Sequence, residues 1–214
     1  MGYMRKELVL TQLDYLAGMT PSKALAETAR LRASAENALL AYQEELAAGG
    51  LLPHYDLDKL IDVMQFFARK VRMVRSVDHK TGEYLADKKK IVPEENTPKD
   101  YLWLNEKLHY WSHLNEFDHS SNEIIMIAAF YMGNTLVKNF PQLCWGLGKK
   151  GKYWRYPNHP SVLWPKKDRK QFQLEPIPII VNSFSLCVSE KTFARLNTAI
   201  DSWIFDARRT LEIQ

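Results

Sequence analysis

Cysteines and long apolar runs are both scarce in this chain of 214 residues. It has two cysteines, Cys144 and Cys187, and no apolar run approaches the roughly 18 residues that a membrane span requires. Charged residues interrupt residues 1–19 too early for the apolar core of a secretion signal. We therefore expect a cytoplasmic protein with free thiols and no membrane association.

Catalytic signatures are missing as well. Glycines lie among lysines in "WGLGKKGKYW", but Tyr153 stands where a phosphate-binding Walker loop requires serine or threonine after its lysine. We interpret this stretch as a lysine-rich hairpin turn between two strands. Cys144, within the same region, is interpreted as a small buried thiol on a strand rather than as a nucleophile.

Three of the six histidines lie in "HYWSHLNEFDH", residues 109–119. His109 and His113 are four positions apart, so they share a helix face and are candidate metal ligands, with Glu116, Asp118 or His119 as a third ligand. A zinc-protease helix would carry glutamate directly after the first histidine, and this chain has Tyr110 there. We therefore interpret both histidines as part of the aromatic end of a helix, and we expect no metal and no cofactor. A metal-dependent enzyme using His109 and His113 is the alternative.

Apolar residues make up 46% of the chain and recur mostly at helical spacing. Proline at the first helical position and the Gly49-Gly50 pair mark the start and the end of one long helix. The helix over 124–139 is apolar on most of its circumference, so we expect it in the middle of the fold. The spacing predicts helices over 5–17, 21–48, 57–74, 98–114, 124–139 and 189–211.

Short aromatic and β-branched segments broken by glycine or proline follow Pro141. We expect three or four strands of a small antiparallel sheet here, with Pro176 and Pro178 on an edge strand or at a bulge. The predicted fold is α+β and mainly helical, with five or six helices. We expect a single domain over 1–214, with helices over 1–140, the sheet over 142–184 and a closing helix over 189–211.

The chain carries 29 basic and 25 acidic residues, a net charge of +4 that permits nucleic-acid binding without implying it. Four of six tryptophans lie between Trp111 and Trp164, and aromatic side chains left exposed there would suit a protein interface. The residues that we predict to bind a partner are Lys149, Lys150, Tyr153, Trp154, Arg155 and Tyr156. Nucleic-acid binding through the lysine-rich loops is an alternative.

The segments "IIMIAAFYMGNTLVKNFPQLCWGLG", "SVLWP" and "EPIPIIV" resemble the layout of small uncharacterised bacterial α+β immunity or interaction proteins. In those proteins an apolar helix containing glycine leads to a tryptophan strand and then to a strand with proline. Their helix commonly has glutamate after the glycine, whereas Asn134 follows Gly133 here. The resemblance implies no catalytic residue. It implies a non-catalytic cytoplasmic protein that binds another protein, such as a toxin that it neutralises, and a homodimer is compatible with it.

Overall fold

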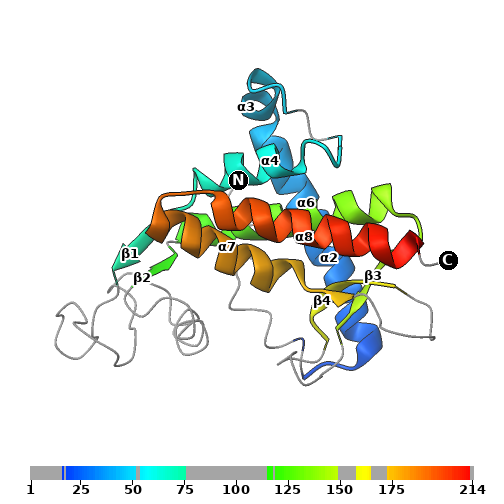
Figure 1. Cartoon of the computed structure of the whole chain (residues 1–214). Coiled ribbons are helices and arrows are strands. Elements are labelled where there is room, and N and C mark those ends of the chain that lie inside the picture. Colours follow the sequence, from blue (N-terminus) through cyan, green and yellow to red (C-terminus); the bar gives the residue numbers. More distant parts are fainter. Residues whose placement is uncertain are drawn as a thin grey trace.

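The computed structural model describes residues 16, 18–51, 54–75, 115–117, 119–148, 158–164 and 173–212. It confirms a mainly helical α+β fold with a small antiparallel sheet in the C-terminal half (Figure 1). Its helices are α2 (Pro21–Leu39), the 3-10 turn η3 (Leu40–Tyr42), α3 (Gln43–Ala48), α4 (Leu60–Ala68), α6 (His119–Asn139), α7 (Pro176–Glu190) and α8 (Ala194–Glu212). Its strands are β1 (Met73–Arg75), β2 (Asn115–Phe117), β3 (Cys144–Leu147), β4 (Pro160–Leu163) and β5 (Gln173–Leu174).

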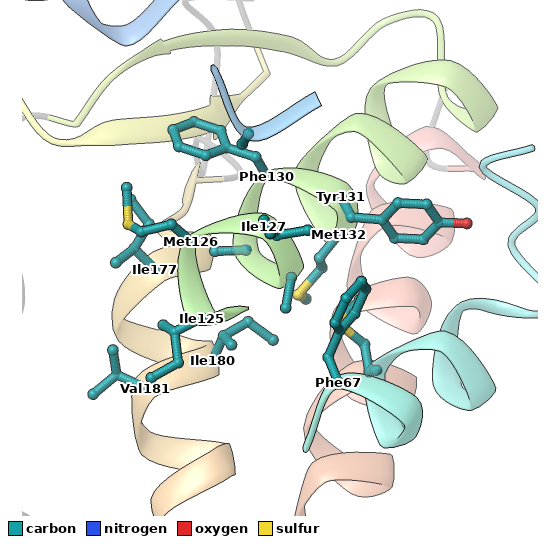
Figure 2. Packing of buried hydrophobic residues seen from close by; sticks show 14 of the residues in the cluster. Phe67, Ile125, Met126, Ile127, Phe130, Tyr131, Met132, Ile177, Ile180 and Val181 are labelled. Carbon is teal, nitrogen blue, oxygen red and sulfur yellow. The ribbon is translucent and has the colours of Figure 1, made fainter. Parts of the chain in front are cut away.

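Helix α6 lies at the centre of the packing. Every residue over 124–136 is buried, which confirms the prediction made from its nearly continuous apolar surface. Helix α7 covers one side of α6 with Ile177, Ile180 and Val181, while Phe67 of α4 packs on another side (Figure 2). Helix α2 also packs on α6. Burial of each large apolar side chain contributes about 1.5–3 kcal/mol, so the buried side chains of α6 contribute strongly to the stability of the fold.

Strands β3, β4 and β5 form an antiparallel sheet in that order. Strand β3 ends at Leu147 and β4 begins at Pro160, so the lysine-rich segment joins two paired strands, as the sequence predicts. Strand β4 also packs against α6 and α7, which places the sheet beside the central helix.

The prediction that Pro176 and Pro178 lie on an edge strand or at a bulge of the sheet is wrong, because α7 begins at Pro176. Proline is well suited to the first turn of a helix, where the backbone N–H groups have no intrahelical acceptor, and both Pro176 and Pro178 lie in that turn. Ile177, Ile180 and Phe184 are buried and recur at helical spacing. The closing helix begins at Ala194 instead of 189, and it packs against α7 and α4.

The predicted helix over 57–74 is also shorter than expected. Helix α4 ends at Ala68, and residues 73–75 form β1, which pairs with β2 in a two-stranded sheet. The hydroxyl of Ser121 accepts a hydrogen bond from the Arg72 N–H at 2.7 Å and donates one to the Arg72 carbonyl at 3.2 Å. The Ser121 side chain of α6 therefore bonds both backbone groups of Arg72, which lies between the end of α4 and the start of β1.

Several predicted boundaries agree with the structure. Helix α2 starts at Pro21, and the helical stretch that it opens ends before Gly49, although a 3-10 turn divides it. The predicted helices over 5–17, apart from Leu16, and over 98–114 lie outside the described residues. Within the described part of the chain, no helix combines the length and the apolar character needed to cross a bilayer.

Candidate functional site

The residues predicted from the sequence to carry function lie outside the described part of the chain. This applies to His109 and His113 and to the predicted partner-binding residues within 149–156. Among the residues that are described, no group of three or more histidine, cysteine, aspartate or glutamate side chains is arranged to hold a metal ion. The candidate site is therefore built from other residues.

Trp145 of β3 packs directly on the backbone of α6. A Cβ atom at Gly133 would lie 2.2 Å from Cζ2 of Trp145, so only glycine allows this approach. The ring also contacts Phe130, with a distance of 5.3 Å between the ring centroids. Trp145 remains partly exposed, so its ring is held by the core while part of it stays accessible.

Asn134 connects three elements through its side-chain amide. Its Oδ1 accepts a hydrogen bond from Nε1 of Trp145 at 2.8 Å, and its Nδ2 donates one to Oε1 of Glu36 at 2.8 Å. Asn134 is 5% exposed, and its oxygen and nitrogen thus both have partners inside the protein. The amide links α6 to β3 and to α2.

Tyr55 lies beside Glu36 and Asn134 in the turn that precedes α4. Its φ is +57°, a left-handed conformation that is rare for an aromatic residue. Its ring stacks on Tyr131 with a centroid distance of 4.9 Å, and its carbonyl accepts a hydrogen bond from Nδ2 of Asn139 at 2.8 Å. Burial, followed by the charge of Glu36, raises the pKa of Tyr55 above its usual value. Contacts on both the ring and the backbone hold this unusual conformation.

Two cations border these aromatic rings. The guanidinium carbon of Arg32 lies 5.5 Å from the centre of the Trp145 ring, and Nζ of Lys138 lies 3.8 Å from the centre of the Tyr55 ring. Arg32, Tyr55 and Trp145 are partly exposed, and Lys138 is exposed. We call the group of Arg32, Glu36, Tyr55, Asn134, Lys138 and Trp145 the Trp145 surface.

Sequence reasoning placed Trp145 on a strand but did not select any member of the Trp145 surface as a site residue. The available signal was the Gly133-Asn134 pair, in which a polar amide follows a glycine within an otherwise apolar helix. Glutamate at position 134 has no N–H to donate to Glu36 and would bring a second negative charge to it. Asparagine can accept from an indole and donate to a carboxylate at once, and this is its role here.

A second polar cluster lies where the three-stranded sheet meets the start of α7. Glu175 is 5% exposed, and its Oε1 accepts a hydrogen bond from Nε2 of Gln173 at 3.2 Å. A Cβ atom at Gly148 would lie 2.9 Å from Oε1 of Glu175 and 2.8 Å from Oγ of Ser161. Burial raises the pKa of Glu175 to about 7, although the hydrogen bond from Gln173 partly opposes this. This buried carboxyl group titrates near neutral pH.

Cys144 corrects one expectation. It lies on strand β3 as predicted, but its side chain is exposed, whereas the prediction placed it in the interior. Cys187 of α7 is free and buried, and burial raises the pKa of its thiol to about 11.

No known protein family, curated protein or solved structure matches this chain.

Proposed function

We propose that this protein is a non-catalytic cytoplasmic protein that binds another protein through the Trp145 surface. Tryptophan, tyrosine and arginine are the residue types that most often dominate the energy of protein interfaces. The Trp145 surface presents one of each, Trp145, Tyr55 and Arg32, all partly exposed and close together. This grouping is the observation on which the proposal rests.

The rigidity of the surface supports the same role. Binding costs free energy when side chains lose rotational freedom, at about 0.5–1.5 kcal/mol for each long side chain that becomes fixed. Trp145 is already held by Gly133 and Asn134, and Tyr55 by its stacking on Tyr131. These two rings have already lost much of their rotational freedom in the folded protein, so binding restricts them little further. They are therefore suited to act as anchors.

A toxin is the first partner that we propose, because residues 124–148 resemble immunity proteins and contain Trp145. The residues that the sequence suggested as partner-binding follow β3 directly along the chain, beginning with Lys149. An interface that includes both groups would use one continuous stretch of sequence after α6.

Site-specific photo-crosslinking in the original host tests the proposal. A photoreactive amino acid is placed at Glu36, which is exposed beside Trp145, and separately at Arg208, which is exposed on α8. We expect crosslinking to one protein species from position 36 and not from position 208. Crosslinking of the chain to itself from position 36 would instead indicate a homodimer, and the same background from both positions would contradict the proposal.

A growth assay then tests neutralisation. The crosslinked protein is expressed alone and together with this chain, and we expect growth to stop in the first case and to recover in the second. Tyr55→Asn is the informative variant, because asparagine tolerates a positive φ while the aromatic ring is lost. We expect this variant to restore growth poorly, whereas Arg208→Gln should restore it fully. If the crosslinked protein does not inhibit growth, the partner is not a toxin.

A further inference from the structure

Arg32 differs from the acidic residues around the Trp145 surface in how its hydrogen-bonding groups are used. Glu36 accepts a hydrogen bond from Asn134, and Asp56, next to Tyr55, accepts one from the Asp58 N–H at 3.0 Å. Among the described residues, no acceptor and no ion-pairing partner lies within bonding distance of the Arg32 guanidinium. A guanidinium group has five N–H donors, and none of those of Arg32 is used by the part of the chain that the structure describes, which leaves a capacity to bind an anion.

Glu36 is positioned to pair with Arg32, but it bonds to another residue. Arg32 and Glu36 are four residues apart on α2, the spacing at which opposite charges commonly pair on a helix. Here the carboxylate bonds to Asn134 of α6 instead, and the guanidinium lies over the Trp145 ring. The folded structure thus keeps apart two charges that the helix alone would bring together.

The surroundings of Arg32 also limit the direction from which a ligand can reach it. The guanidinium carbon lies 5.5 Å from the centre of the Trp145 ring and Nε is fully buried, while the side chain as a whole is partly exposed. Hydrogen bonds to a guanidinium form in its plane, so a ligand would approach the edge formed by the two terminal nitrogens. A carboxylate fits this edge well, because its two oxygens can accept two parallel N–H bonds.

The surrounding charges favour a single carboxylate over a polyanion. Arg32 and Lys138 are positive, whereas Glu36 and Asp56 are negative, so the four charges cancel. A nucleic-acid backbone is bound by clusters of uncompensated lysine and arginine side chains. At this surface such a backbone would meet two carboxylates along with the two cations.

We propose that Arg32 is the anchor for the protein partner, and that it binds the carboxylate of an aspartate or glutamate side chain through both terminal nitrogens. The inference rests on the proposed function, because it specifies the chemistry of the partner at the Trp145 surface.

Nuclear magnetic resonance of the whole chain tests this with two small probes. N-acetyl-glutamate methylamide supplies the carboxylate, and N-acetyl-glutamine methylamide at equal ionic strength is its uncharged match. The signals to follow are the Arg32 Nε–H, identified by its loss in Arg32→Lys, and the Trp145 indole N–H, identified by its loss in Trp145→Phe. We expect saturable shifts of both signals with the glutamate probe, at millimolar concentrations, and none with the glutamine probe.

Variants on one helix complete the test. Arg32→Gln should weaken binding of the glutamate probe, read at the Trp145 indole, by at least about tenfold, because the charge-assisted hydrogen bonds are lost. Arg32→Lys should weaken it less, because lysine keeps the charge but lacks the planar fork. Arg30→Gln is the matched control: Arg30 is an exposed arginine of α2 whose Nε donates to Oε2 of Glu27 at 2.8 Å, and this change should leave binding as it is.

The outcomes separate this inference from the proposed function. Equal shifts from both probes, no shift at all, or unchanged binding in Arg32→Gln would overturn the carboxylate site, even if crosslinking from position 36 succeeds. Shifts produced by a short oligothymidylate, but not by the glutamate probe, would also overturn it and would point to nucleic acid. A carboxylate-specific response with no protein crosslinked from position 36 would support the site and contradict the proposed function.

Discussion

Replacement of Glu175 by glutamine should make the protein more stable, and increasingly so as the pH rises. Burial raises the pKa of Glu175 from its usual 4.5 to about 7. One pKa unit corresponds to about 1.4 kcal/mol, so the ionised form of this group costs the folded state about 3 kcal/mol. Glutamine has nearly the same shape, cannot ionise, and can still accept the hydrogen bond from Gln173. The variant therefore removes the charge with little change to the packing.

The sign of the effect follows from the direction of the shift. A carboxyl group with a raised pKa in the folded chain is protonated in both the folded and the unfolded state below pH 4.5, so the penalty is absent there. The penalty grows as the pH rises from 4.5 to about 7 and is complete above 7. We expect Glu175→Gln and the natural chain to have similar free energies of unfolding near pH 4.5. At pH 8 the variant should be more stable by up to about 3 kcal/mol.

Urea denaturation followed by circular dichroism, at a series of pH values from 4.5 to 8, measures this difference. The control is Glu44→Gln, which removes an exposed carboxylate from α3 and should give a difference from the natural chain that changes little with pH. A stability gain for Glu175→Gln that is the same at both ends of the series would refute the reasoning. The reasoning would also be refuted if the natural chain became more stable than the variant as the pH rises.

Three further predictions concern the packing of Trp145 and the two thiols. Gly133→Ala should lower the free energy of unfolding by about 1–3 kcal/mol, measured in urea, because the added Cβ must displace the Trp145 ring. Asn134→Ala should cost about 1–3 kcal/mol, because the indole N–H loses its acceptor, and the indole N–H resonance of Trp145 should move. In the native state Cys144 should react quickly with a thiol reagent while Cys187 reacts only after unfolding, which a titration of thiols with and without urea will show.

The helices could be predicted from the sequence where the pattern of apolar residues is compatible with a helix and not with a strand. The segment 124–139 is apolar almost all round, and α6 occupies it and is buried. The segment 172–184 has two interpretations, because a short apolar stretch with prolines suits an edge strand as well as the first turn of a helix. Helix α7 packs against both α6 and α8, and these two helices cover its apolar residues. This packing favours the helix over a strand. Those contacts cannot be read from the local sequence.

The Trp145 surface could not be predicted, because it depends on contacts between distant residues. Glu36 and Asn134 are 98 positions apart and belong to helices that meet only in the folded chain. Glu36 fits an exposed position of α2, and the sequence around Asn134 does not show which residues its side-chain amide bonds. The role of such residues in the fold is recognised from their tertiary hydrogen bonds, because these bonds show which distant residues they contact.

Gly133 and Asn134 act as a pair, and their contacts bear on the partner that we propose for Arg32. The absence of a side chain at Gly133 lets the Trp145 ring approach α6, and the next residue accepts the indole N–H that this approach buries. The same asparagine then bonds to Glu36, which would otherwise be the natural partner of Arg32 on the surface of α2. Two adjacent residues in the core thus hold an aromatic ring beside the Arg32 guanidinium and give Glu36 a hydrogen-bond donor on another helix. A chain with glutamate at position 134 would lose the donor to Glu36, and Arg32 would then pair within its own helix.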